Sequence, residues 1–234
     1  MSAFLLTGTD TGIGKTFVAC ALLHAARALG LSALGMKPVA AGAREVDGQN
    51  EDAARLREAA SFDAGAALCN PYCLRQPVAP HIAAKEEGVT IDPSRILAAF
   101  AALRTKADLV IVEGVGGFRV PLGPAYDTAD LAVDLGLPVV LVVGMRLGCI
   151  NHALLTAEAI AARGLSFAGW IANRIDPHMQ RFEENLAALA QRLPAPLLGV
   201  VPYSAGQDSA AVAAQVSLPA GMRRRGTGRT TEGR

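Results

Sequence analysis

The chain has 234 residues, of which 51% are hydrophobic and 18% are charged, and its formal net charge is +1. Such an apolar composition excludes intrinsic disorder for most of the chain. No apolar run reaches the roughly 18 residues of a membrane-spanning helix, so we expect no membrane association. The length is typical of one large α/β domain or two small ones.

The charge is distributed unevenly along the chain. Residues 219–234 hold five arginines and one glutamate, whereas the rest of the chain has a net charge of −3. Because positive and negative charges nearly cancel in residues 1–218, this part of the chain does not indicate nucleic-acid binding, and we predict no nucleic-acid partner. The basic stretch has too few apolar side chains to pack. We therefore predict one domain over 1–218, followed by a disordered tail over 219–234.

The first residues and the cysteines indicate a reducing compartment. Met1 to Phe4 contain no basic segment of the kind that opens a secretory signal, so we expect a cytoplasmic protein. The four cysteines, Cys20, Cys69, Cys73 and Cys149, form no CxxC pair. Free thiols are therefore expected rather than a zinc site or disulfides.

Short apolar runs alternate with longer amphipathic stretches. In chain order the pattern predicts a strand at 4–6, a helix at 15–29, a strand at 33–36, helices at 51–60 and 94–104, strands at 109–112 and 139–143, a helix at 151–163, a strand at 168–172, a helix at 178–193 and a strand at 197–201. These strands show no inside–outside alternation, so both of their faces must be buried. We predict a three-layer α/β fold with a mostly parallel sheet flanked by helices. Residues 61–93, with four prolines, are predicted to form a long loop over the sheet edge, typical of a substrate loop or lid.

The strongest motif is a glycine-rich loop between the first predicted strand and helix, Gly8-Thr-Asp-Thr-Gly-Ile-Gly-Lys-Thr16. Its glycines allow backbone N–H groups to face a phosphate, and the start of the helix adds positive potential. In such a P-loop, Lys15 reaches the β- and γ-phosphates and the Thr16 hydroxyl binds Mg²⁺. The pattern departs from the strict motif at one position, because Thr9 stands where a glycine is usual.

Carboxylates that accompany a P-loop usually lie at the carboxyl ends of neighbouring strands. Glu113 directly follows the predicted strand 109–112, so we expect it to face the P-loop and to hold Mg²⁺ or its water. Asp52 opens a helix, where a helix cap and a metal ligand are equally good interpretations of its position. Asp108 lies at the opposite end of the strand and is interpreted as solvated surface.

The chain has 18 arginines but only four lysines, and two of these lysines fall at the same sheet edge. Lys15 lies in the P-loop, and Lys37 ends the predicted strand 33–36. A second cation there would neutralise charge on a phosphoryl group in transfer, although a solvated lysine is the alternative. No histidine has the spacing of a triad or a metal site, and His24 is interpreted as helix surface. The residues alone predict a Mg²⁺-dependent enzyme that handles the γ-phosphate of a nucleoside triphosphate, with the acceptor left open.

Several further motifs occur in a fixed order along the chain. They are the P-loop (8–16), Met-Lys-Pro-Val-Ala (36–40), Asn-Pro-Tyr (70–72), Pro-His (80–81), Val-Glu-Gly-Val-Gly-Gly (112–117), Gly-Cys-Ile-Asn-His (148–152), Gly-Trp-Ile-Ala-Asn (169–173) and Pro-Ala-Pro-Leu-Leu-Gly (194–199). Together they resemble the dethiobiotin synthetase family of the biotin pathway. The resemblance runs from about residue 2 to residue 205.

This resemblance implies ATP-dependent closure of a ureido ring on 7,8-diaminononanoate with CO₂. One amine traps CO₂ as a carbamate, and the carbamate oxygen attacks the γ-phosphate. The second amine then attacks the mixed carbamic–phosphoric anhydride, so that ADP and phosphate are released. A carbamate is a poor electrophile until its oxygen carries a phosphoryl group. Such a site must hold several anions, which agrees with two lysines in one cleft.

The resemblance also implies roles for individual residues. Lys37, Lys15 and Thr11 are the expected catalytic group, and Thr16, Asp52 and Glu113 are the expected Mg²⁺ ligands. Asn173 is expected to read adenine, and Pro202 to Ser204 to lie beside the base. The expected contacts of ATP and Mg²⁺ are Gly12, Ile13, Gly14, Lys15, Thr16, Phe17, Asp52, Glu113, Gly114, Val115, Gly116, Asn173, Arg174, Pro202, Tyr203 and Ser204.

Substrate contacts are implied at two places. Gly148, Cys149, Ile150 and Asn151 begin a predicted helix, whose N–H groups would bind the distal carboxylate of the substrate. The family contributes this segment from the other subunit, so a homodimer is implied; without the resemblance, packing by Cys149 and capping by Asn151 would be favoured. Ala41 stands where the family often has serine, which leaves only a backbone contact. Gly12 replaces an acidic residue that some members carry.

Two other P-loop classes offer alternative functions. A switch ATPase of the partition or nitrogenase-iron-protein type would carry a lysine at the position of Asp10, where this chain has an anion. Amidoligases of the cobyric-acid type append a glutaminase domain, for which 234 residues leave no room. A pure binding module would have no use for Lys15, Thr16 and Glu113 together.

Overall fold

A six-stranded parallel sheet forms the centre of the protein in the computed structural model, which describes residues 2–44, 46, 48–203 and 208–222. The spatial order of the strands is β2-β5-β1-β6-β7-β8. The strands are β1 (Ser2–Gly8), β2 (Ala33–Met36), β5 (Leu109–Glu113), β6 (Val139–Met145), β7 (Phe167–Arg174) and β8 (Leu197–Val201). Every neighbouring pair is parallel, so all carboxyl ends lie at one edge.

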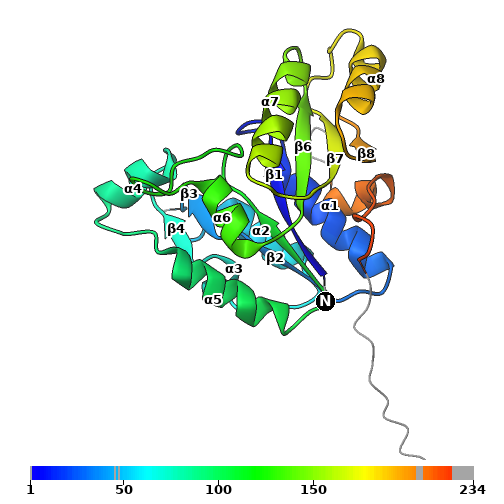
Figure 1. Cartoon of the computed structure of the whole chain (residues 1–234). Helices are drawn as coiled ribbons and strands as arrows, with labels where there is room; N and C mark the ends of the chain where they lie inside the picture. The colour runs from blue at the N-terminus through cyan, green and yellow to red at the C-terminus, as the bar shows by residue number, and fades with distance from the viewer. Residues whose placement is uncertain (1, 45, 47, 204–207, 223–234) are drawn as a thin grey trace, which may run out of the picture.

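Helices bury both faces of this sheet (Figure 1). Phe4 and Leu6 of β1 pack with α1 (Lys15–Ala28) and α2 (Glu51–Ala59) on one face. Leu5, which points the opposite way, packs with α5 (Pro93–Arg104) and α6 (Thr128–Leu135) on the other. On that second face, α7 (Cys149–Ala162) and α8 (Phe182–Arg192) cover β6 and β7. The predicted three-layer architecture is therefore confirmed.

All of the helices and strands expected from the sequence are present, with ends that differ by a few residues. The helix α6 was not expected, although Asp127 and Asp130 form a capping box at its start and Gly136 ends it in the left-handed conformation. A Ser/Thr/Asp residue followed three positions later by an acidic side chain is a recognisable start signal. The short, eight-residue length of α6 hides its periodicity.

The prediction of one continuous loop over 61–93 was wrong. This stretch contains α3 (Ala66–Cys69), β4 (Tyr72–Leu74) and α4 (Pro80–Glu86). The strand β4 pairs in parallel with β3 (Val39–Ala41), which forms a second, two-stranded sheet beside the main one. Elements of three to seven residues leave no periodic signal, because they span at most two turns of a helix or one repeat of a strand.

Asp108 is not the solvated residue that the sequence suggests. It is half-buried, and its Oδ2 accepts hydrogen bonds from the backbone N and from Oγ of Ser32 at 2.9 and 2.7 Å. These bonds join the start of β5 to the loop before β2. Near the C-terminal end, Val212 of the 3₁₀ helix η1 (Ser209–Gln215) and Val216, which follows that helix, pack against the α1 face of the sheet.

Most of the predicted tail, residues 223–234, lies outside the described residues. The division into a domain over 1–218 and a tail therefore stays a prediction. Within the described ranges, no helix has the length and apolar character needed to cross a membrane.

Candidate active site

The P-loop connects β1 to α1 at the carboxyl edge of the sheet. Gly12 and Gly14 have φ angles of 74° and 80°, in the left-handed region that glycine adopts without strain. Gly14 is the N-cap of α1, and no side chain caps this helix start. The first N–H groups of α1 are therefore available to an anion, which the helix dipole also favours.

Lys15 is the first residue of α1, and its side chain folds back across the P-loop. Its Nζ donates a hydrogen bond of 2.8 Å to the carbonyl oxygen of Asp10. The carboxylate of Asp10 in turn forms an ion pair of 2.5 Å with Arg146 at the end of β6. Burial, followed by the charge of Lys37, lowers the pKa of Lys15 to about 8. Among the described residues, the Lys15 ammonium has no carboxylate partner at hydrogen-bond distance.

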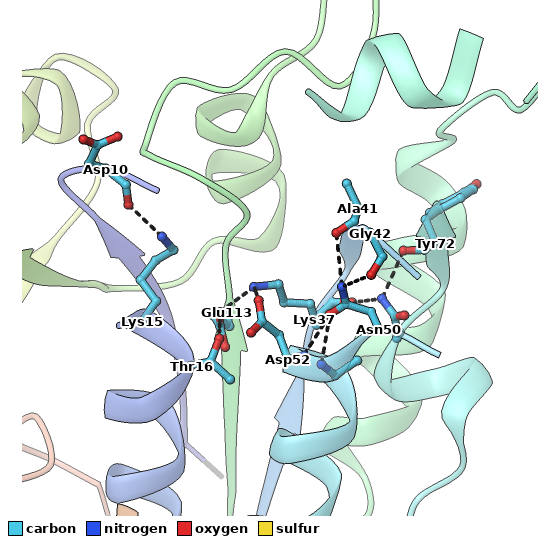
Figure 2. A network of polar contacts seen from close by, with 12 residues as sticks. Asp10, Lys15, Thr16, Lys37, Ala41, Gly42, Asn50, Asp52, Tyr72 and Glu113 are labelled. Carbon is cyan, nitrogen blue, oxygen red and sulfur yellow. Dashed lines mark hydrogen bonds and ion pairs between the residues drawn. The ribbon is translucent and has the colours of Figure 1, made fainter. Parts of the chain in front are cut away.

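Lys37 lies between the two carboxylates that the sequence singled out. Its Nζ is 2.5 Å from Oε1 of Glu113 and 3.1 Å from Oδ2 of Asp52. The hydroxyl of Thr16 donates to the same Oε1 of Glu113 at 2.7 Å. Figure 2 shows these groups converging from α1, β5, α2 and the end of β2. Strand order explains the convergence, because β5 lies between β2 and β1.

Burial and charge fix the ionisation of this cluster. Burial alone would lower the pKa of Lys37, but the charges of Glu113 and Asp52 outweigh it and raise that pKa above its ordinary value. Burial would raise the pKa of Asp52, but Lys37 outweighs it and holds the pKa below its ordinary range. Lys37 is therefore cationic and Asp52 anionic at neutral pH.

Two asparagines outside the predicted set hold the backbone of this cluster. Nδ2 of Asn70 donates to the carbonyl oxygens of Lys37 and Tyr72 at 2.6 and 3.0 Å. The backbone N of Lys37 donates to the carbonyl of Cys69 at 2.7 Å, so the segment that carries the Asn-Pro-Tyr motif binds Lys37 on both sides. Asn50 caps α2 through its Oδ1 while its Nδ2 donates to Ala41 at 3.1 Å. Together these amides position Lys37 and the helix that carries Asp52.

The two lysines line one cavity of about 740 Å³, which we call the lysine cavity. The segment 77–80, within the stretch predicted to form a substrate loop or lid, also contributes to its wall. Arg55 on α2 contributes as well and was not expected from the sequence. The structure brings these predicted site residues together on the cavity wall: Thr11, Gly12, Gly14, Lys15, Thr16, Phe17, Lys37, Ala41, Asp52, Glu113, Val115 and Gly116. The cavity therefore combines the P-loop, both lysines and both carboxylates.

A second cavity of about 840 Å³, the Asn173 cavity, extends along α1 from the P-loop. Its wall includes the predicted residues Asn173, Arg174 and Tyr203. Asn173 is buried, and its Nδ2 donates to the carbonyl oxygen of Ile13 at 2.7 Å. This bond uses one of the two Nδ2 hydrogens, and Oδ1 is the acceptor atom of the amide. His24, which was interpreted as helix surface, is half-buried and lines this cavity as well.

Some predicted site residues do not line either cavity. The side chain of Ile13, a P-loop residue, is buried in the core. The backbone N–H of Gly114 donates to the carbonyl oxygen of Leu6 at 2.9 Å, and Pro202 is exposed. Ser204 lies outside the described residues. The segment 148–151 starts α7, with Gly148 as a left-handed N-cap, and does not reach the lysine cavity of its own chain.

The donor set of the cluster consists of oxygen atoms. Oε2 of Glu113 is fully buried and has no hydrogen-bond partner among the described residues. No group of three or more His, Cys, Asp or Glu side chains with the arrangement of a metal site occurs in the described part of the chain. A metal held here would thus rest on two carboxylates and the Thr16 hydroxyl, a set of hard oxygen ligands that suits Mg²⁺.

Comparison with known proteins places the chain among known enzymes and known folds. Residues 2–210 match a family model described as an AAA domain. The chain is 73% identical to the ATP-dependent dethiobiotin synthetase BioD of Aromatoleum aromaticum over 219 residues, which cover 93% of this chain and 97% of that protein. It is 55% identical to the protein of the same name from Xanthomonas axonopodis pv. citri, over 93% of this chain and 98% of that protein.

Solved structures confirm the fold at low sequence identity. The MinC:MinD cell division protein complex of Aquifex aeolicus aligns with a TM-score of 0.55 and 16% identity, over 87% of this chain and 82% of that chain. A ParA family ATPase from Chlorobium tepidum aligns with a TM-score of 0.54 and 13% identity, over 91% and 90% of the two chains. These likenesses show a P-loop α/β fold alone. The identities of 73% and 55% over nearly the whole length show that the chain belongs to the ATP-dependent dethiobiotin synthetase family.

Proposed function

We propose that this chain closes the ureido ring of dethiobiotin on 7,8-diaminononanoate, using CO₂ and ATP and releasing ADP and phosphate. The observation that carries the proposal is the lysine cavity, where two ammonium groups share one wall with Thr16, Asp52 and Glu113. Family membership supports the same reaction. The oxygen of a carbamate becomes a leaving group only after phosphorylation, so the site must bring two anions, carbamate and triphosphate, into contact. Cations fixed on both sides reduce the repulsion between them.

Lys15 and Lys37 divide this task in the proposed mechanism. Lys15 starts α1 beside the open N–H groups and would hold the β- and γ-phosphates. Lys37 follows β2, which is separated from β1 by β5, and would hold the carbamate against the γ-phosphate, which stabilises the charge that develops between them. Thr11, exposed at the tip of the P-loop, would contact the same phosphates. The anhydride then collapses when the second amine attacks its carbonyl carbon.

Mg²⁺ is part of the proposal. Thr16, Asp52 and the unpartnered Oε2 of Glu113 would hold the ion, because all are hard oxygen donors. When bound, Mg²⁺ neutralises charge on the β- and γ-phosphates. The chain's own contribution is to place these oxygens within one cluster and to keep Asp52 ionised.

ATP is the proposed nucleotide because of the orientation of Asn173. One of its two Nδ2 hydrogens binds Ile13, and its Oδ1 would accept a hydrogen bond from the base. Adenine offers an amino donor at its edge, whereas guanine offers a carbonyl acceptor at the same position, which Oδ1 would repel. Arg174 and Tyr203 line the same cavity and would lie beside the base or ribose.

The remaining parts of the proposal concern the substrate carboxylate and the assembly. We propose that the segment 148–151 of a partner subunit binds the distal carboxylate, in a cytoplasmic homodimer. The support is the N-terminus of α7, which has Gly148 as its N-cap and no side-chain cap. The N–H of Cys149 donates to the carbonyl of Arg146 at 3.0 Å, so the N–H groups of Ile150 and Asn151 would bind the carboxylate. Ala41, on the wall of the lysine cavity, would contact the substrate through its backbone alone.

An assay of phosphate release from ATP tests this function. We expect ATP hydrolysis only when 7,8-diaminononanoate and bicarbonate are both present, with dethiobiotin formed in equal amount. Lys37→Ala should reduce kcat by about 10²–10³-fold while ADP still binds, because it removes one preorganised charge from the transition state. Lys85→Ala, at an exposed lysine on α4, is the matched control and should keep wild-type turnover.

The alternative of a nucleotide-dependent switch predicts a different result. In that case phosphate release would proceed without the diamine and bicarbonate, and no dethiobiotin would form. Full ring closure by Lys37→Ala would instead contradict the role of that lysine.

A further inference from the structure

The helix α2 presents a row of three charged side chains to the two cavities. Asp52, Arg55 and Glu58 are three residues apart, so they lie on one face of the helix. Asp52 lines the lysine cavity, Glu58 lines the Asn173 cavity, and Arg55 lines both. The helix therefore runs alongside the whole path between Lys37 and Asn173.

Arg55 is the charged residue at the junction of these cavities. Among the described residues, the two cavities share Gly12, Gly14, Phe17 and Arg55. The glycines offer only backbone, and Phe17 offers an apolar ring, so Arg55 is the one charged side chain that reaches both spaces. Cys20 of α1 lines the Asn173 cavity together with Arg55, so this arginine and α1 border the same space.

The present partner of Arg55 is easily exchanged. Its Nη2 is 2.5 Å from Oε1 of Glu51, one turn earlier in α2, and the two side chains are 57% and 63% exposed. Ion pairs this exposed contribute little to stability, because water screens them. Lys37, by contrast, is 4% exposed and held by two carboxylates. Arg55 is thus the cation in the lysine cavity that is most free to turn toward an anion.

We propose that Arg55 binds the α-phosphate of the nucleotide. The inference rests on the proposed function, which holds the β- and γ-phosphates at Lys15 and the base at Asn173. A nucleotide that spans both cavities must pass its α-phosphate through the junction where Arg55 lies. The planar guanidinium then pairs with two phosphate oxygens, a geometry that lysine does not offer.

Calorimetric titration with ADP, AMP and adenosine tests this contact. Arg55→Gln should weaken the binding of ADP and AMP by about tenfold, since both carry an α-phosphate, and should leave adenosine binding within about twofold of wild type. Arg55→Lys keeps the positive charge but cannot pair with two phosphate oxygens at once, so it should weaken ADP and AMP binding less than Arg55→Gln does. Arg57→Gln is the matched control, because Arg57 lies on the same helix, pairs with Asp63 at 2.6 Å and lines neither cavity. This control should bind all three compounds like the wild type.

Two results would overturn the inference. ADP and AMP binding that Arg55→Gln leaves unchanged would remove Arg55 from the nucleotide site. An equal loss for adenosine would place the contact on the sugar or base instead of the phosphate. Because these titrations need no turnover, a wild-type protein that binds ADP but fails to form dethiobiotin would contradict the proposed function without affecting this test.

Discussion

The two lysines of the active site differ in the partners that surround their ammonium groups. Lys37 is paired with Glu113 and Asp52, and its pKa is raised. Lys15 is 7% exposed, and among the described residues its ammonium has only the carbonyl of Asp10 at hydrogen-bond distance; its pKa is lowered to about 8. The site therefore stabilises the charged form of Lys37. It destabilises the charged form of Lys15, and a bound phosphate would offset that cost.

This cost predicts a pH-dependent gain in stability for Lys15→Met. The folded-state pKa of Lys15 is about 8 and its ordinary value is 10.5. The unfolded chain therefore binds more protons between these values, and the free energy of unfolding rises with pH there. The penalty is fully present below pH 8 and disappears by about pH 10.5. At pH 7 we expect the ligand-free variant to be more stable than wild type by about 3 kcal/mol, from the two values at 1.36 kcal/mol per pKa unit.

Urea denaturation of both proteins between pH 7 and pH 10.5 measures this difference. Lys85→Met, at an exposed position of α4, provides the control and should show no such pH-dependent gap. A gap for Lys15→Met that stays constant across this pH range would show that the ammonium of Lys15 is not destabilised by its surroundings.

At the scale of elements, the P-loop contains two glycines that share a left-handed backbone conformation but differ in the space available for a side chain. Gly12 and Gly14 both have positive φ. A Cβ on Gly12 would have no atom within 4 Å, whereas a Cβ on Gly14 would come within 2.3 Å of Nδ2 of Asn173. Gly14 thus allows α1 to approach β7 closely enough for Asn173 to bind the carbonyl of Ile13.

Alanine substitutions separate these two requirements. Gly12→Ala adds only the left-handed strain, so we expect it to lower the free energy of unfolding by about 1–2 kcal/mol. Gly14→Ala adds the same strain and also displaces the buried Asn173 amide, for a total loss of about 3 kcal/mol or more. Urea denaturation at pH 7 compares the two variants. Equal losses would mean that Asn173 moves aside without losing its hydrogen bond.

Long, strongly patterned elements were predictable from the sequence, and short ones were not. The strands β5 and β6 are continuous apolar runs, which identify them as buried strands without tertiary information. The strands β3 and β4 have three residues each and pair with each other, and Asn70 joins the segments just before them through the carbonyl of Lys37. That bond links positions 33 residues apart, so no local pattern reveals it.

The same distinction applies to the site. The P-loop, Lys37 and Glu113 were predictable because they stand at strand ends, and parallel strands bring their ends together. Arg55 was not, because its position on a cavity wall follows from the packing of α2 against α1. The sequence shows Arg55 as one of several charged residues on a polar helix face.

At the scale of the whole molecule, strand order divides the site into two halves. The strands β2, β5 and β1 bring Lys37, Glu113 and the P-loop side by side, and β7 brings Asn173 from the other half of the sheet. The segment 148–151 follows β6 and opens α7, outside both cavities of its own chain. Next to it, Leu147 is 93% exposed. An exposed apolar side chain beside an open helix N-terminus agrees with the proposed contact to a partner subunit.

Mixing two inactive variants tests this arrangement. Lys37→Ala removes the cavity lysine, and Gly148→Val strains the N-cap of α7, where Gly148 has a φ of 95° and a Cβ would meet no atom within 4 Å. If each site combines the lysine cavity of one subunit with the α7 start of its partner, a mixed dimer has one intact site. Equal mixing forms mixed dimers for half of the protein, so about a quarter of wild-type dethiobiotin formation should return. Each variant alone should stay inactive at the same concentration, and a mixture that also stays inactive would assign residues 148–151 to the site of their own chain.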